Sequence, residues 1–505
     1  MDVWLERLVR RRSREEQTKT AHFQKIGGRV LTGLKENFEE SVAYFNNTLR
    51  VTENFDVLYH TFEMGGKKAC MYFIDGMVKD EVMQKLLQYF FGLKAKDMPE
   101  DVHGVLKKFM PYVEVGLITS ADEAIRNILS GVPVLILEGY DKIISIDART
   151  YPARSVDEPE KDKVMRGSRD GFVETLVFNT ALIRRRIRDP RLTMYITEAG
   201  TVSHTDIVLC YMEDRVEKKF LEEIKRRIKK ISVESLTMNQ QSLAECLYHG
   251  KWFNPFPKFK FTERPDAAAA AVLEGDIIIL VDNAPQAMIL PTTIFDIVEE
   301  ADDYYFPPIT GTYLRLTRFI TNTLALILTP TFMLLMQHPE WISERWQFIV
   351  VKDPLNIPLL LQFLILEFAL DGLRLASLNT PNTLSLPLSV IAGVIIGDFT
   401  VQSGWFNSEA MLYMAFVAIA NYTQVSLELG YALKFMRIVL LILTHCFGLW
   451  GYIGGIVLDI LAIAFNKTIG GRSYLYPLVP LKPRQLVQRI FRVPLPKSEN
   501  QKAMR

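Results

Sequence analysis

The stretch between Phe319 and Asn466 is a nearly unbroken succession of apolar runs. A soluble domain of ordinary size cannot bury so much apolar surface, whereas a bilayer core about 30 Å thick accommodates helices of about 20 apolar residues. The sequence therefore predicts an α-helical membrane domain. Its six candidate membrane segments are Phe319–Met336, Leu355–Leu370, Leu386–Gly404, Met411–Leu429, Leu433–Leu449 and Tyr452–Phe465. The second and sixth are short, so four crossings with one re-entrant hairpin are the alternative.

Basic residues next to these segments predict their orientation, because Lys and Arg tend to remain on the cytoplasmic side. Six crossings bring Arg315, Arg318, Arg374, Lys434, Arg437 and a basic tail to one side. The other side receives Arg345 and Lys352, which lie among acidic residues. We therefore expect both termini in the cytoplasm. The arginine-rich start of the chain does not resemble a signal peptide, which agrees with a cytoplasmic N-terminal region.

Several functional classes are disfavoured by composition and motifs. A formal net charge of +1 over 505 residues argues against nucleic-acid binding. The four cysteines, Cys70, Cys210, Cys246 and Cys446, lack the paired spacing of a zinc site. We find no GxxxxGK[ST], HExxH, GxSxG or CxxC motif. The sequence therefore predicts neither an enzyme nor a metal or cofactor site.

An internal repeat organises the part of the chain before the membrane segments. A strand, a turn and a helix beginning at Ala69–Ile74 recur at Ile207–Met212. A helix followed by two strands also occurs twice: Ala121–Leu129, Val134–Leu137 and Ile143–Ile146, then Pro265–Leu273, Ile277–Val281 and Ala287–Leu290. The matching order predicts two related α/β subdomains, each with helices on a small mixed sheet.

The predicted fold is therefore multi-domain, with two related cytoplasmic α/β subdomains followed by an α-helical polytopic membrane domain. We place an N-terminal helical arm at 1–55, subdomain 1 at 56–165, a linker helix with subdomain 2 at 166–305, the transmembrane domain at 310–470 and a basic cytoplasmic tail at 471–505. The arm has apolar residues at helical spacing and is expected to pack on its own domain.

The segment that joins the two subdomains is highly charged. Its interleaved acidic residues favour an ion-pair network that holds subdomains or subunits together, and binding of phosphate or acidic lipid headgroups is the alternative. The candidate interface residues are Arg166, Arg169, Arg184, Arg185, Arg186 and Arg188.

Polar residues inside the apolar region are the strongest functional candidates, since ionisable groups in a bilayer usually face a bundle interior or a hydrated path. Glu367, Asp371 and Arg374 are spaced as one face of a helix in the second segment, and Asn421, Gln424 and Glu428 in the fourth. Asp398 follows Gly393 and Gly397, whose spacing suits close helix contact. These residues predict the lining of a solute path. The alternative is that they pair with one another and hold the bundle together.

Four stretches of the chain form a specific set: Ala148–Leu192, which contains YPARSVDEPEKDK, Thr262–Leu290, Asp302–Tyr305 and Tyr474–Pro480. They resemble the A subunits of bacterial spore germinant receptors, the GerA family, and the likeness extends from about Phe55 to Pro483. Other members commonly have a proline in the fourth membrane segment, where this chain has Tyr422, Thr423 and Gln424. A helix break is therefore not assumed there.

The resemblance implies a multi-pass protein of the spore inner membrane, with its N-terminal region and tail facing the spore core. It also implies a role in germination, a homo-oligomeric ring such as a pentamer around an ion conduit, and other inner-membrane germination proteins as partners.

Two functions follow from these expectations. The first is a subunit of an oligomeric ion channel that releases monovalent cations or amplifies their release. The second is a non-conducting scaffold or signalling subunit of a germinant receptor or dipicolinate-release complex. A secondary transporter is a weaker option, because it predicts an inverted repeat within the membrane region.

Overall fold

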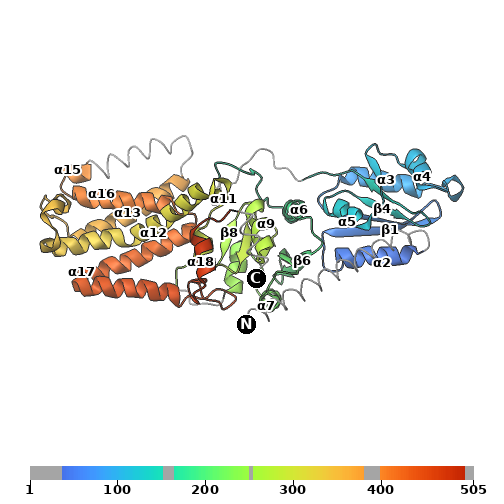
Figure 1. The fold of residues 1–505 in the computed structure, drawn as a ribbon. Helices are drawn as coiled ribbons and strands as arrows, with labels where there is room; N and C mark the ends of the chain where they lie inside the picture. The colour runs from blue at the N-terminus through green and yellow to red at the C-terminus, as the bar shows by residue number, and fades with distance from the viewer. Residues whose placement is uncertain (1–36, 152–163, 249–253, 380–398, 495–505) are drawn as a thin grey trace, which may run out of the picture. The chain divides into compact units, whose positions relative to one another are not determined.

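The computed structural model describes residues 37–151, 164–248, 254–379 and 399–494 (Figure 1). The chain divides into two compact units. The first, the α/β unit, comprises Met1–Lys163, Ser168–Leu247 and Phe261–Leu290, and the second, the helical unit, comprises Val164–Gly167, Tyr248–Lys260 and Pro291–Arg505.

The α/β unit contains two successive runs of elements in the same order. The first run is α2 (Phe38–Leu49), β1 (Val57–Met64), β2 (Lys67–Ile74), α3 (Asp80–Phe91), η1 (Ala95–Asp97), α4 (Val102–Phe109), β3 (Val115–Ile118), α5 (Ala121–Leu129), β4 (Val134–Leu137) and β5 (Ile143–Ile146). The second is α6 (Leu176–Arg186), β6 (Leu192–Ala199), β7 (Thr205–Met212), α7 (Lys218–Lys229), α8 (Asn239–Leu247), β8 (Lys260–Thr262), α9 (Pro265–Glu274), β9 (Ile277–Val281) and β10 (Ala287–Leu290).

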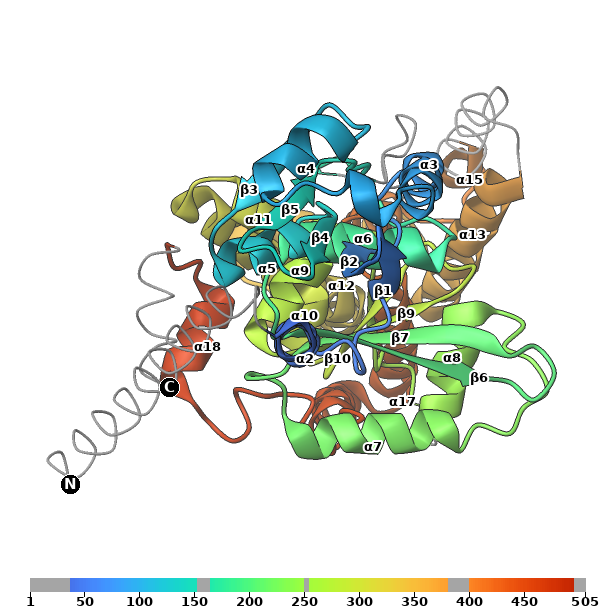
Figure 2. The same cartoon turned by 90° about the vertical axis from the view of Figure 1, so that its right-hand side faces the viewer.

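Their strands form two sheets with corresponding orders, β1-β2-β4-β5-β3 and β6-β7-β9-β10-β8. This agrees with the duplication in the sequence. The prediction of mixed sheets was wrong, because the strand pairings of both sheets are antiparallel. The strands missing from the sequence-based pattern are β1, β3, β6 and β8. The long pair β6 and β7 is seen well in Figure 2.

Each side of the first sheet is covered by helices, because successive strand residues face opposite sides. On β2, Cys70 and Tyr72 pack with α2 and α5, whereas Ala69 and Met71 pack with α3 and α4. In the second sheet, Val208 and Cys210 of β7 pack with α6 and α9. Burial on both sides explains why the central strands are continuous apolar runs rather than alternating ones.

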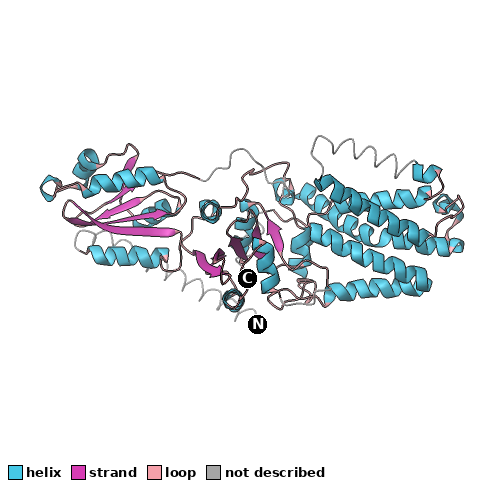
Figure 3. Ribbon diagram, turned by 180° about the vertical axis from the view of Figure 1, so that it is seen from behind, coloured by secondary structure: helices cyan, strands magenta, loops and turns pink. Residues whose placement is uncertain are grey.

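The helical unit consists largely of long helices (Figure 3). Its elements are α10 (Ile294–Val298), α11 (Asp302–Tyr305), α12 (Pro308–Gln337), η2 (Pro339–Trp341), η3 (Glu344–Ile349), α13 (Leu359–Asn379), α15 (Thr400–Gln402), α16 (Ser408–Tyr422), α17 (Leu427–Ala464) and α18 (Pro483–Ile490). We call the end of the bundle where α12 begins the basal end and the end where α12 finishes the distal end.

The long helix α17 is two antiparallel legs that meet at Gly448, whose φ of 56° and ψ of −132° are not helical. Glycine is needed because residues with a Cβ rarely adopt this conformation. A Cβ on Gly451 would overlap the carbonyl oxygen of Leu443, and one on Gly455 would overlap the side chain of Leu440. The legs, 427–447 and 449–464, correspond to the fifth and sixth predicted segments.

Two predicted segments differ from the observed helices. The second was expected to end near Asp371, but α13 continues to Asn379 and holds Asp371 and Arg374 inside the helix. The fourth was predicted as one helix over Met411–Leu429, and this was wrong. α16 ends at Tyr422, and α17 begins at Leu427 with the Ser426 hydroxyl accepting a hydrogen bond from the Leu429 amide. The chain thus breaks here without proline, because a side-chain cap starts a new helix.

Among the described residues, α12 and α17 are each long and apolar enough to cross a membrane. The third predicted segment lies largely outside the described residues, as does the N-terminal arm up to residue 36.

Candidate functional site

A buried cluster of four charged side chains joins α13 to the first leg of α17. The Arg437 Nε donates to Glu367 Oε1 at 2.5 Å, and its Nη1 donates to the carbonyl oxygen of Ala325 in α12 at 2.6 Å. Glu367 and Arg437 are 2% and 0% exposed. One guanidinium therefore connects three helices.

The second half of the cluster is Lys434, one helical turn before Arg437. Its Nζ lies 3.7 Å from Glu367 Oε2, donates to the carbonyl oxygen of Glu367 at 3.1 Å and pairs with Asp371. Two cations thus face two carboxylates, so the cluster is formally neutral. Neutrality matters because burying an unpaired charge in an apolar bundle costs roughly several kcal/mol of folding free energy.

A cavity of about 20 Å³ opens beside this cluster, room for about one water molecule. Its polar lining includes Arg374, whose guanidinium lies 5.4 Å from the ring centres of both Tyr422 and Tyr431. The Asn421 side-chain oxygen also lines the cavity and has no hydrogen-bond partner in the described structure. The remaining lining residues are Glu367, Leu370, Asp371, Ala418, Gly430 and Lys434.

The predicted polar residues therefore divide into separate groups. Glu367 and Asp371 belong to the charge cluster, and Arg374 and Asn421 to the cavity. Gln424 lies in the connection between α16 and α17 and donates to the side chain of Asn322, whereas Glu428 is exposed in the first turn of α17. The expectation that Asn421, Gln424 and Glu428 share one helix face is wrong, because the helix is broken between them. Asp398 lies outside the described residues.

Lys434 and Arg437 lie at the start of the fifth predicted segment, Leu433–Leu449, where they were counted only as basic residues on the cytoplasmic side, so their role in the cluster was missed. The available signal was their spacing: two basic residues three apart can face two acidic residues four apart on a neighbouring helix. Starting the fifth segment at Leu433 rather than Leu427 put both residues in its first turns instead of deeper in the helix.

The arginines predicted to form an interface lie in different surroundings. Arg184, 0% exposed, makes a bidentate pair with Asp56 at 2.8 and 2.9 Å and so joins the two repeats of the α/β unit. Arg186 pairs with Asp170 at 2.5 Å, and Arg185 lies 4.3 Å from the centre of the Tyr151 ring. The remaining three, Arg166, Arg169 and Arg188, are exposed. Arg188 donates to the Arg185 carbonyl, and Arg166, which belongs to the helical unit, lies near the Phe306 ring.

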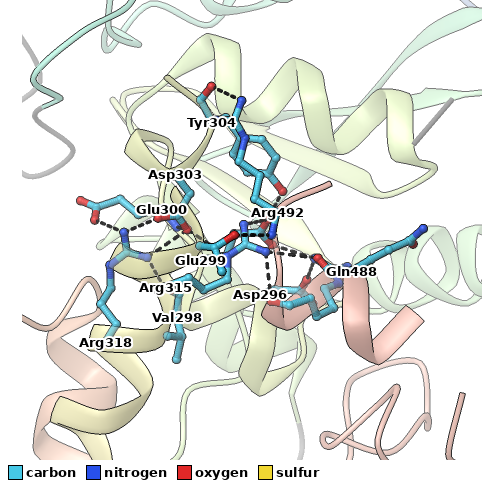
Figure 4. Close-up of polar contacts among 12 residues, drawn as sticks. Asp296, Val298, Glu299, Glu300, Asp303, Tyr304, Arg315, Arg318, Gln488 and Arg492 are labelled. Atoms are coloured by element: carbon cyan, nitrogen blue, oxygen red, sulfur yellow. Dashed lines mark hydrogen bonds and ion pairs between the residues drawn. The ribbon is translucent and has the colours of Figure 1, made fainter. Parts of the chain in front are cut away.

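A second ion-pair network lies at the basal end of the helical unit (Figure 4). The fully buried Asp303 accepts from Arg318 at 2.5 and 3.0 Å and from Arg315 at 3.2 Å. Arg315 also pairs with Glu299 at 3.0 Å. These contacts hold α10 and α11 against the start of α12.

The C-terminal tail completes this basal network. Arg315 donates to the carbonyl oxygens of Gln488 and Arg489, and Arg492 donates to that of Tyr304 (Figure 4). Arg489 in turn pairs with Asp296 and Glu299, both at 2.7 Å. The tail, predicted only to be basic, thus attaches α18 to the segment that leads into α12.

Docking of the tail should weaken in acid. Burial raises the pKa of Glu299, but the positive charges of Arg489, Arg315 and Lys260 outweigh it and lower this pKa from 4.5 to about 2. The ionised Glu299 therefore stabilises docking fully above pH 4.5, and this stabilisation is lost as pH falls toward 2. We expect the protection factors of the α18 amides, which are corrected for the pH dependence of intrinsic exchange, to fall over this range.

The matched variants for this prediction are Arg489→Ala and Arg484→Ala, the latter removing an exposed basic residue of the same helix. Arg489→Ala should accelerate exchange in α18 already at neutral pH, and Arg484→Ala should not. Equal protection in both variants would contradict a docking role for the Arg489 ion pairs.

Comparisons with known proteins agree on one family. The profile described as Bacillus/Clostridium GerA spore germination protein matches residues 43–504. The chain is similar to stage V sporulation protein AF of Bacillus subtilis (strain 168), with 35% identity over 454 residues that cover 90% of this chain and 92% of that protein. It is also similar to spore germination protein B1 of the same organism, with 27% identity covering 89% and 94%.

A solved structure gives a weaker likeness. The crystal structure of the N-terminal domain of the A subunit of the Bacillus megaterium spore germinant receptor GerK3 has 23% identity and a TM-score of 0.40, and the match covers 51% of this chain and 95% of that one.

Proposed function

Because this chain belongs to the GerA family of spore germination proteins, we propose that it acts in germination as a multi-pass subunit of an oligomeric channel in the spore inner membrane. The channel would release monovalent cations from the spore core or amplify their release. We propose no catalytic role.

The distribution of side chains along the helical unit supports membrane insertion. Basic residues gather at the basal end, which the positive-inside rule associates with the cytoplasm, here the spore core. The distal end exposes Trp341, Trp346, Trp405 and Trp450. Exposed tryptophans at helix ends are typical of the membrane interface, where an amphipathic ring meets lipid headgroups. Both termini would then face the core.

The observation that carries the conduction proposal is the polar cavity next to the charge cluster. Ionisable groups are costly in a bilayer unless they pair or reach water. Glu367, Lys434 and Arg437 are paired and buried, so we assign them to holding the helices. Asp371, Arg374 and Glu428 are at least partly exposed, and we propose that they face a hydrated path completed by neighbouring subunits.

The alternative is a non-conducting scaffold or signalling subunit. Its support is that Glu367 is neutralised within its own bundle and is not available to a passing cation. In that case a partner protein would conduct the ions, and the partly exposed residues would lie in contacts with that partner.

Replacement of Glu428 tests conduction. Because this carboxylate is exposed, Glu428→Gln should leave protein level and assembly intact, while removing a negative charge that concentrates cations and lowering potassium flux up to about tenfold. Flux is measured in liposomes that contain the purified protein with and without other germination proteins.

The matched control is Glu344→Gln, an exposed carboxylate in a distal loop. It should leave flux unchanged. If flux requires the other germination proteins and is the same with Glu428→Gln, Glu344→Gln and the unmodified protein, the scaffold is favoured.

A further inference from the structure

Asp459, in the second leg of α17, is a buried carboxyl group without a counter-charge in the part of the chain that the structure describes. It is 2% exposed, and neither of its carboxyl oxygens has a hydrogen-bond partner among the described residues. Glu367, similarly buried, has Arg437 and Lys434 beside it. Asp459 therefore differs in kind from the paired carboxylates of the bundle.

The position of Asp459 follows from the packing of the two legs. Gly451, Gly455 and Asp459 are spaced four residues apart and are all buried, so they lie on one face of the second leg. The two glycines contact Leu443 and Leu440 of the first leg. Asp459 continues this face by one turn toward the basal end, and it is enclosed between closely packed helices.

Near the end of this leg, Lys258 lies over the Tyr474 ring, and both are buried without a hydrogen-bond partner among the described residues, but neither forms an ion pair or hydrogen bond with Asp459 there. The lysines and arginines of the first leg and of α12 have their own partners. Lys434 and Arg437 of the first leg pair with Asp371 and Glu367, and Arg315 and Arg318 of α12 pair with Asp303. The remaining titratable residues of the first leg are Glu428, Tyr431, His445 and Cys446, and none of them forms an ion pair or a hydrogen bond with Asp459 in the described structure.

An ionised carboxylate in such a site would lose its hydration and gain no donor in return. The cost for an isolated charge in a low-dielectric interior is large enough that the group takes up a proton instead. We propose that Asp459 is a proton-binding site: its carboxyl group carries a proton while the two legs of α17 are closed, and it ionises only when they separate.

Protonation of Asp459 would be linked to the conformation of the two legs. A protonated Asp459 is compatible with the closed pair of legs, whereas its ionised form needs water or a cation and so favours separation of the legs at the Gly448 turn. The second leg is held to α12 at its distal end by the hydrogen bond between Tyr452 and Thr331, 2.7 Å long. Opening near Asp459 therefore leaves this distal attachment in place. This inference does not depend on ion conduction.

Infrared spectroscopy of the full-length protein in lipid nanodiscs tests the proton directly. At neutral pH we expect a carbonyl band of a protonated carboxylic acid that shifts on labelling all aspartates with ¹³C. Asp459→Asn should abolish this band, and Asp353→Asn, which changes an exposed distal carboxylate, should leave it unchanged. Asp459→Glu should retain an acid band at a shifted position.

Thermal unfolding gives a second readout. The unfolding temperature of the unmodified protein should lose a contribution as pH rises from about 4, where an exposed aspartate titrates, toward and past neutrality, because the closed state holds a proton that the unfolded chain releases, and Asp459→Asn should remove this contribution. Absence of the ¹³C-sensitive acid band from the unmodified protein would overturn the proposal, whether or not the variants fold. So would a band that persists in Asp459→Asn.

Discussion

Replacing Arg437 with alanine should destabilise the helical unit by about 3–5 kcal/mol. The change leaves Glu367 buried with only the more distant Lys434 as a counter-charge, and it removes the donor to the Ala325 carbonyl. Three helices lose their common contact, so the loss should appear as low yield and a lower unfolding temperature of the detergent-solubilised protein. Lys467→Ala, which removes an exposed basal charge, is the control and should change neither quantity.

A paired substitution separates lost charge balance from lost packing. In Glu367→Leu/Arg437→Leu no charge of the pair remains, and replacement of a buried ion pair by apolar residues is often neutral or stabilising. Lys434 keeps Asp371 as its partner in this variant. We expect the double variant to recover most of the stability that Arg437→Ala loses. If it is as unstable as Arg437→Ala, packing or the Ala325 contact matters more than charge balance.

Arg184→Ala should have a comparable effect on the α/β unit, again about 3–5 kcal/mol. The fully buried guanidinium pairs with Asp56 and donates to the carbonyl oxygen of Leu192 at 3.2 Å, so its removal leaves a buried carboxylate and two repeats without their central contact. Hydrogen exchange of β6 in the full-length protein should accelerate accordingly. The control is Arg188→Ala, an exposed substitution expected to stay within about 0.5 kcal/mol.

Two outcomes would contradict a role for Arg184 at the junction of the repeats. Unchanged protection of β6 in Arg184→Ala would mean that the remaining contacts, such as the hydrogen bond from the Met194 amide to the Asn54 side chain, hold the two repeats together without Arg184. Faster exchange confined to one repeat would mean that Arg184 stabilises its own helix rather than the junction.

Charged residues around the α13–α17 cluster look alike in the sequence but suggest different tasks in the structure. Glu367 and Arg437 are buried and neutralise one another, whereas Asp371 and Arg374 remain partly exposed beside a cavity. We infer that the first kind maintains the bundle and that the second is available to water, ions or other subunits. The proposed effects of Glu428→Gln and Arg437→Ala follow this division, since the first should change flux and the second stability.

Continuous apolar runs were enough to predict the central strands of both repeats and the two legs of α17, because such runs are strong signals. This signal missed edge strands such as β1, most of whose residues are exposed or half-buried. The break after Tyr422 was also missed. The cap that starts α17 there depends on one hydroxyl, Ser426, and leaves the apolar pattern unchanged.

Local sequence was sufficient to determine the duplicated α/β order, the apolar helices and the inventory of charged residues within them, since hydrophobic burial and helical spacing act over short distances along the chain. Only the tertiary structure decided which charges meet. Glu367 and Arg437 are 70 positions apart in the chain, and Asp56 and Arg184 are 128 apart. Electrostatic pairing depends on distance in space, which a pattern along one strand or helix does not contain. For the same reason, only the folded hairpin showed that Asp459 is buried without a partner among the described residues.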